Sequence, residues 1–306
     1  MISLFKYTSA KYIDSIVKDG GRLKLSGHEE LNDPCDLNFD VSQKNKHDSY
    51  RMLLNVAFLC EFGTDPMFSR NKWFQSTCKL TRASMKNNAK YEENPGINMM
   101  LRYYLKSRKA LKDFFDKYEL EFDKTYTKII EDLKNRTLIG CLTKDYLNKT
   151  MWAHYADNNT GICVEYEFDS TDNLWDAIYT TEENDFDLYT ILQYILPRQY
   201  FKIETKAEDN LQCREACFRP FRRKTIEWKE EKETRLIFSK KNNNELILEN
   251  GLWFYPNVKV KSIYAGCNIK QDDLRYLKEI CKGSSIDLYQ LKILKGKTNF
   301  EVERIL

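Results

Sequence analysis

The chain has 306 residues, of which 42% are hydrophobic and 31% are charged. Its 49 basic and 46 acidic residues leave a formal net charge of only +3, so the bulk charge does not call for a polyanionic partner. A chain of this length and composition can bury a sizeable core, which excludes a disordered protein.

The sequence predicts a cytoplasmic protein with no membrane segment and no bound metal. No stretch approaches the roughly 18 apolar residues that cross a bilayer, and the first residues lack a basic segment followed by a long apolar one. Nine scattered cysteines, an odd number, suit reduced thiols better than a disulfide framework. Cys213 and Cys217 are the closest pair, but no second pair or nearby histidine completes a zinc site.

The N-terminal segment predicts a strand, a helix and a second strand. Residues 3–9 alternate as a strand does, and residues 9–21 carry one helical apolar stripe that ends in two glycines. Residues 22–26 read as a short strand, and residues 27–36 form a loop. In this loop Asn32, Asp33 and Pro34 are turn formers, so a plain turn is favoured over a loop that lines a pocket.

From about residue 41 to 136 the character is helical, with apolar residues every three or four positions and charges between them. No internal repeat appears. We therefore predict a single domain, residues 1–306, that contains a large helical insertion at 41–136.

The second half returns to β character. Strands are predicted at 137–143, 161–168, 234–238, 245–249, 258–266, 285–294 and 300–306, and helical periodicity at 144–158, 187–196 and 271–282. The predicted fold class is α+β, with a mixed, mainly antiparallel sheet flanked by helices.

Residues 228–238 read WKEEKETRLIF and place Glu231, Glu233 and Arg235 at alternate positions. On a strand these three side chains would share one face, with Trp228 anchoring the start. Two carboxylates on one face repel, which raises one pKa and suits general-base or charge-stabilising work. The alternative is a solvated edge strand with alternating charges.

Residues 151–155 cluster a tryptophan, a histidine and a tyrosine near the end of a predicted helix. Such a cluster can stack on a planar ring and hydrogen-bond a polar ligand. The alternative is that Trp152 and Tyr155 are core and that His154 bonds a backbone carbonyl, and taken alone this packing interpretation is favoured.

Several catalytic signatures are missing. The chain has no P-loop, no G-x-G-x-x-G, no H-E-x-x-H and no G-x-S-x-G, and its three histidines are too few for a histidine-rich metal nuclease. Carboxylates and aromatic residues therefore have to carry any chemistry.

Read in order, five motifs resemble the bacterial family of unknown function DUF2971. The family pattern runs L-Y-K-Y, F-N-D-P-F, C-F-S, M-W-x-H-Y-A, G-x-C-x-E-F, W-x-x-E-x-E-x-R and a closing I-x-x-I-x-x-G. The matching segments of this chain are LFKYTS, LKLSGHEELNDPCD, CLTKDYLNKTMWAHYADNNTGICVEYEF, WKEEKETRLIF and VKSIYAGCNI. The matches run from the first residues to near the last strand, outside the helical block. The chain departs from the pattern at Leu31, Cys35 and Leu142, where the family has phenylalanine.

A weaker resemblance is to the ADP-ribosyltransferase fold, which implies a first strand that holds the nicotinamide ribose and a late strand with a Glu-x-Glu pair. The usual first-strand arginine or histidine is absent here. The resemblance implies NAD as a substrate, with the dinucleotide touched by the first strand and the nicotinamide pocket shaped by the 151–155 helix. The implied catalytic residues are Glu233, Glu231, Tyr155 and His154, and the implied binding residues are Lys6, Tyr7, Trp152, Asn32, Asp33 and Arg235.

Two functions from different classes follow. The first is an NAD-using, ADP-ribosyltransferase-like effector in bacterial defence or toxin systems, with a protein or nucleic-acid target and an antitoxin or defence-system partner. The second is a non-catalytic or nucleic-acid-binding sensor in which the Glu-x-Glu-x-Arg segment is an internal salt-bridge network. The basic runs at 219–224 and 239–244 would then contact phosphates, although a solvated face is the commoner role of such runs.

Overall fold

The computed structural model describes residues 1–31, 33, 35–42, 45–46, 48–49, 52, 124, 126–201, 207–241 and 244–306. The chain forms two compact units. The first comprises Met1–Leu37, Leu133–Glu182 and Phe221–Leu306, and the second comprises Asn38–Asp132 and Glu183–Pro220. Most of the predicted insertion at 41–136 lies outside the described residues, so its place within a single domain stays a prediction.

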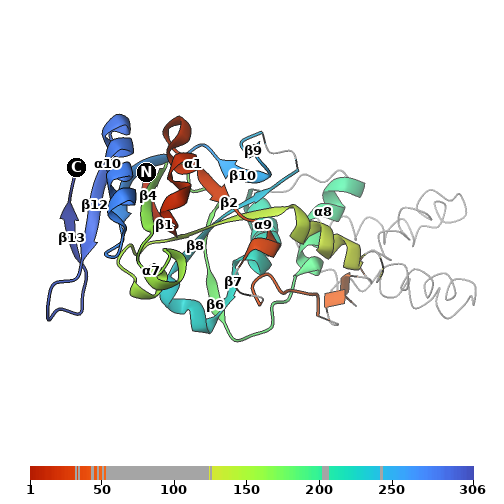
Figure 1. Ribbon diagram of the computed structural model, residues 1–306. Coiled ribbons are helices and arrows are strands. Elements are labelled where there is room, and N and C mark those ends of the chain that lie inside the picture. Colours follow the sequence, from red (N-terminus) through yellow and green to blue (C-terminus); the bar gives the residue numbers. More distant parts are fainter. Residues whose placement is uncertain are drawn as a thin grey trace, which may run out of the picture. The chain divides into compact units, whose positions relative to one another are not determined.

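The first unit is built on an eight-stranded sheet in the order β13-β12-β11-β4-β1-β3-β8-β5 (Figure 1). Every neighbouring pair is antiparallel except β11 and β12, which are joined through helix α10 and run parallel. The prediction of an α+β fold with a mixed, mainly antiparallel sheet is therefore confirmed. The strands are β1 (Ile2–Thr8), β3 (Thr137–Thr143), β4 (Ile162–Phe168), β5 (Leu174–Asp176), β8 (Glu233–Ser239), β11 (Lys259–Ala265), β12 (Asp287–Lys292) and β13 (Glu301–Arg304).

Two smaller sheets complete this unit. One has the order β2 (Leu23–Leu25), β10 (Leu252–Tyr255) and β9 (Ile247–Glu249), and the other pairs β6 (Ile178–Thr180) with β7 (Arg223–Thr225) in parallel. The helical elements are α1 (Ile13–Val17), α7 (Lys149–Tyr155), α10 (Gln271–Ser284) and the 3-10 segments η1 (Ala10–Tyr12), η2 (Lys18–Gly20), η3 (His28–Glu30) and η5 (Ile226–Glu231).

Both faces of the large sheet are buried, because neighbouring residues of its central strands enter different core clusters. Val164 and Ile263 pack in one cluster with the buried side chains of α1 and α10, whereas Cys163 and Tyr264 pack in the other with α7. Leu274, Leu277 and Cys281 of α10 are buried at helical spacing, which explains why this amphipathic segment folds onto the sheet.

The second unit includes α8 (Leu188–Phe201) and most of α9 (Ala207–Arg222). In it Tyr126 donates a hydrogen bond to Asp40 and accepts one from the backbone N–H of Val41 at 2.6 Å. Within the described residues, no helix is both long and apolar enough to cross a membrane.

A tight turn after α7 fixes this helix against the end of β11. Asp157, Asn158 and Asn159 all have positive φ, and the backbone N–H of Asn268 donates to the carbonyl oxygen of Asn159 at 3.0 Å. A Cβ atom at Gly266 would lie 2.1 Å from that same oxygen, so only glycine allows this approach.

We expect Gly266→Ala to lower the free energy of unfolding by about 3 kcal/mol, because the added methyl group has to displace backbone atoms. Gly283→Ala is the matched control: it lies inside α10 with no heavy atom within 4 Å of an added Cβ, so it should stabilise by up to about 1 kcal/mol. Urea unfolding of both variants measures the difference, and equal effects would contradict this account of the turn.

Candidate functional site

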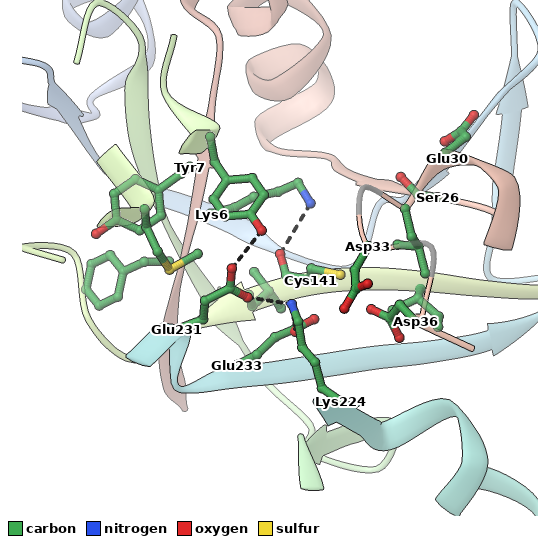
Figure 2. Close-up of a pocket in the computed structure, with 16 residues that line it drawn as sticks. Lys6, Tyr7, Ser26, Glu30, Asp33, Asp36, Cys141, Lys224, Glu231 and Glu233 are labelled. Carbon is green, nitrogen blue, oxygen red and sulfur yellow. Dashed lines mark hydrogen bonds and ion pairs between the residues drawn. The ribbon is translucent and has the colours of Figure 1, made fainter. Parts of the chain in front are cut away.

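A pocket lies where strands β1 and β3 separate. These neighbours share a single registered pair, Phe5 with Thr143, although β1 pairs along its whole length with β4, and β3 with β8. Lys6 and Tyr7 line the pocket from β1, and Ile139 and Cys141 line it from β3. Figure 2 shows the side chains that line the cavity. The cavity volume is about 130 Å³. A gap in strand pairing therefore provides the space for a site.

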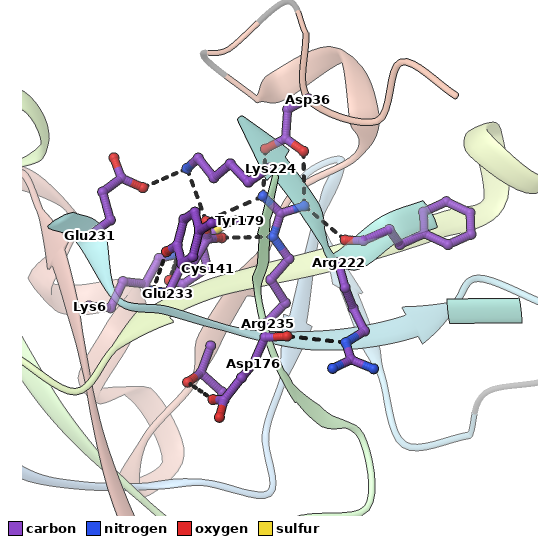
Figure 3. A network of polar contacts seen from close by, with 12 residues as sticks. Lys6, Asp36, Cys141, Asp176, Tyr179, Arg222, Lys224, Glu231, Glu233 and Arg235 are labelled. Atoms are coloured by element: carbon purple, nitrogen blue, oxygen red, sulfur yellow. Dashed lines mark hydrogen bonds and ion pairs between the residues drawn. The ribbon is translucent and has the colours of Figure 1, made fainter. Parts of the chain in front are cut away.

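Lys224 of β7 lies between the two glutamates of the Glu-x-Glu pair. Its ammonium is 2.5 Å from Glu231 Oε2 and 2.9 Å from Glu233 Oε2 (Figure 3). The side chains of all three residues are at most 7% exposed. One buried cation thus joins two buried carboxylates at the wall of the pocket, which all three residues line.

Arg235 of β8 extends this network away from the pocket. Its Nε donates to Glu233 Oε1 at 3.0 Å, and its two terminal nitrogens donate to the two carboxylate oxygens of Asp36 at 2.9 and 2.6 Å. The remaining donors reach the carbonyl oxygen of Phe221 at 2.8 Å and Glu233 Oε2 at 3.3 Å. All five N–H groups of this fully buried guanidinium are therefore satisfied.

Glu231 also ties helix α7 to the network. Its Oε1 accepts a hydrogen bond from the Tyr155 hydroxyl at 2.6 Å, and its backbone carbonyl accepts one from the Thr143 hydroxyl at 2.7 Å. The Asn148 side chain caps α7 by accepting from the backbone N–H of Met151 at 3.1 Å, which sets where the helix begins. The Tyr155 hydroxyl consequently points at a carboxylate of the pocket.

The expectation of three charges on one strand face is wrong in its local geometry. Glu231 ends the 3-10 segment η5, Lys232 adopts a left-handed conformation with φ 48°, and β8 begins only at Glu233. The solvated-edge alternative is wrong too, because β8 lies between β3 and β5 and residues 233–238 are all buried. The left-handed Lys232 lets Glu231 and Glu233 meet the same lysine.

The predicted repulsion between the two carboxylates is also corrected. Burial by itself raises the pKa of Glu233, but the neighbouring cations of Arg235 and Lys224 outweigh it and bring the pKa to about 2. The same carboxylates raise the pKa of Lys224 against the opposing effect of burial. Glu233 is therefore an anion at neutral pH and stabilises positive charge without serving as a proton donor.

Residues 151–236 match the sequence model of the family described as Protein of unknown function (DUF2971). The similarity to DUF2971 is limited to this segment of the chain. The segment runs from α7 into β8 and contains Tyr155, Lys224, Glu231, Glu233 and Arg235.

The sequence also suggests DUF2971 motifs before residue 151 and after residue 236. These motifs lie outside the matched segment. Searches of curated proteins and of solved structures found no match. None of the comparisons supports the resemblance to ADP-ribosyltransferases.

Three residues proposed to bind a dinucleotide line the pocket from outside the DUF2971 segment. The Lys6 ammonium donates to the carbonyl oxygen of Cys141 at 3.3 Å. The Tyr7 hydroxyl donates to the carbonyl oxygen of Asp145 at 2.7 Å. Asp33 Oδ1 accepts from the backbone N–H of Cys35 at 2.8 Å, and its Oδ2 is buried without a hydrogen-bond partner. Asn32, the fourth, lies outside the described residues.

Trp152, His154 and Arg235 are not placed to touch a ligand in this pocket. Trp152 is wholly buried, donates its indole N–H to the carbonyl oxygen of Tyr146 at 2.8 Å and packs edge-on against Tyr7, so the packing interpretation holds for it. His154 is exposed and contacts the ring of Trp228 outside the pocket lining. Arg235 uses every donor within the network and has no exposed surface.

Sequence reasoning missed Lys224 as a site residue. It is the last residue of the basic run 219–224, for which the sequence suggests either phosphate contacts or, more commonly, a solvated face. In the structure Arg223 and Lys224 are buried, and the Arg222 guanidinium lies over the ring of Trp175. Spacing offered no signal for Lys224, because its neighbour Arg223 on the same short strand is buried too, and its partners follow only from the tertiary fold.

We expect Lys224→Met to lower the free energy of unfolding by about 3 to 5 kcal/mol, because it leaves two buried carboxylates without their common cation. The control Lys144→Met removes an exposed partner of Asp176 and should cost no more than about 1 kcal/mol. Adding Glu231→Gln to Lys224→Met should recover part of the loss. Urea unfolding tests all three variants, and equal losses for the two single variants would contradict a buried network.

The pH dependence of stability should report Glu233. Its pKa is about 2 in the folded state against an ordinary value of 4.5, so its stabilisation is complete above pH 4.5 and is lost as the pH falls towards 2. The amount is about 3 kcal/mol. We expect the free energy of unfolding to fall more steeply over this range in the wild type than in Glu233→Gln. Parallel pH profiles would show that Glu233 is not held ionised.

Proposed function

We propose that this pocket binds the nicotinamide–ribose end of a nucleotide of the NAD type and breaks the bond between the ring and the ribose. The observation that carries the proposal is that Glu231 and Glu233 meet Tyr155 and Lys6 at one cavity, although they come from three different parts of the chain. Released or transferred ADP-ribose would be the product.

The chemistry needs an anion more than an acid. Cleavage of this bond develops positive charge on the ribose, and a fixed carboxylate in a water-poor site stabilises that charge. In NAD the nicotinamide ring is a positively charged pyridinium, and it becomes neutral nicotinamide when its bond to the ribose breaks. The leaving group therefore needs no proton. Glu233 fits this role because its low pKa keeps it ionised.

The size and charge of the pocket favour the cationic end of the substrate. The volume of about 130 Å³ is below the roughly 300 Å³ at which cavities begin to enclose drug-sized ligands, so only the reacting part of a dinucleotide would be enclosed. Acidic side chains outnumber basic ones in the lining: Glu30, Asp33, Asp36, Glu231 and Glu233 stand against Lys6 and Lys224. Such a lining attracts a pyridinium ring more than a diphosphate.

The proposal includes the biological setting that the DUF2971 resemblance implies. The protein would act in the cytoplasm as an effector of a bacterial defence or toxin system, on a protein or nucleic-acid acceptor. An antitoxin or another defence-system protein would restrain it.

A second candidate function is non-catalytic, and the closure of the network favours it. Lys224 already neutralises both glutamates, and Arg235 has no spare donor. In that case the network has a structural role in a sensor module. It holds α7 in place through Tyr155, and it holds β8 in place through the contact with Asp36.

Nicotinamide release from NAD separates the two candidates. We expect release by the wild type and a loss of at least about 100-fold in Glu233→Gln, the size of effect seen when one group that stabilises transition-state charge is removed. Glu230→Gln, the exposed neighbouring glutamate, should keep wild-type release. Thermal unfolding of each variant shows whether a loss reflects chemistry or folding.

Tyr155→Phe provides a milder second variant, because it removes one hydrogen bond to Glu231 and leaves every charge in place. Wild-type release by a folded Glu233→Gln variant would overturn the catalytic role. Absence of release by the wild type, with protein and nucleic-acid acceptors both supplied, would favour the structural network.

A further inference from the structure

Lys6 differs from the other cations at the pocket in having no carboxylate partner. Its ammonium donates to one backbone oxygen, that of Cys141, at 3.3 Å (Figure 2). Among the described residues, no carboxylate lies within 4 Å of it, whereas Lys224 and Arg235 each contact two. Lys6 is thus a part-buried amine that lines the pocket and has no ion-pair partner among the described residues.

Burial without a partner disfavours the charged form of a lysine. The Lys6 ammonium is partly withdrawn from water at the wall of the pocket, and this desolvation lowers its pKa against the attraction of Glu233. At neutral pH, Lys6 is therefore in the free-amine form in a larger fraction of molecules than a lysine in water would be. Free amines in a cavity are nucleophiles towards carbonyl carbon.

Hydrogen-bond acceptors line the same cavity. Asp33 Oδ2 is buried without a donor, and Ser26 and Glu30 add further oxygen atoms to the lining. A ligand that supplies hydroxyl donors would satisfy Asp33. An anionic group would meet an excess of carboxylates instead.

We propose that Lys6 forms an imine with the carbonyl carbon of a small hydroxylated aldehyde, such as the open-chain form of a reducing sugar. The amine nitrogen adds to the carbonyl carbon and gives a carbinolamine. The carbonyl oxygen then leaves as water with the two hydrogens that the nitrogen gives up, and a carbon–nitrogen double bond remains. Hydroxyl groups of the ligand donate to Asp33.

This chemistry goes beyond the proposed cleavage of NAD and does not require it. Imine formation uses Lys6 and Asp33, whereas the proposed cleavage depends on Glu233. A protein that releases no nicotinamide can still form the imine, so the failure of one proposal leaves the other standing.

Reductive trapping tests the imine directly. Protein at pH 7 is incubated with glyceraldehyde and sodium cyanoborohydride, which adds hydride to the imine carbon and leaves a stable secondary amine, and peptides are analysed by mass spectrometry. We expect Lys6 to be labelled at least about ten times faster than the exposed Lys270 and Lys282, because its amine is desolvated in the pocket and has no carboxylate partner that would hold it charged. Labelling of Lys6 no faster than of these lysines overturns the proposal.

Two variants keep the test specific. Lys6→Met should fold, because it replaces a poorly compensated cation with an apolar chain of similar length, and it should lose the fast-labelled site. Asp33→Asn should slow labelling by glyceraldehyde more than labelling by propanal, which has no hydroxyl groups. Equal slowing for both aldehydes would overturn the role of Asp33, and fast labelling that persists in Lys6→Met would overturn that of Lys6.

Discussion

The ion pairing of Lys224 with Glu231 and Glu233 is the interaction on which the candidate site depends. Two buried carboxylates a few ångströms apart repel strongly, and each also loses its hydration, so placing them there without a cation would be costly. Lys224 offsets both costs, and Arg235 adds a second cation on the far side of Glu233. Glu233 consequently keeps its charge at the wall of a cavity, where that charge can act on a ligand.

The arrangement of the strands gives this network its place. Lys224 belongs to the short strand β7, Glu233 and Arg235 to the central strand β8, and Asp36 to the loop after η3. Helix α7 reaches the same point through the hydroxyl of Tyr155. The separation of β1 from β3 beyond Phe5 leaves room beside the network. The pocket therefore lies next to buried charged side chains.

Lys6 and Lys224 show how two lysines in one cavity take opposite states. Lys224 has two carboxylates within 3 Å and is held charged, whereas Lys6 has only a backbone oxygen and is pushed towards the neutral amine. The first stabilises the anions and the second provides a nucleophile. The same residue type thus supports two kinds of chemistry, and the difference comes from the neighbours alone.

The sequence by itself determined the fold class, most strands of the second half, and the grouping of Tyr155, Glu231 and Glu233 as candidate site residues. These features follow from local periodicity and from short motifs, and both can be recognised from neighbouring residues in the sequence. Tertiary structure alone decided that Arg235 is wholly buried, that His154 faces solvent, and that Lys224 neutralises the Glu-x-Glu pair. The reason is physical: burial and charge compensation depend on β7, β8 and the loop of Asp36 meeting in space, and the spacing of residues along the chain does not encode that meeting.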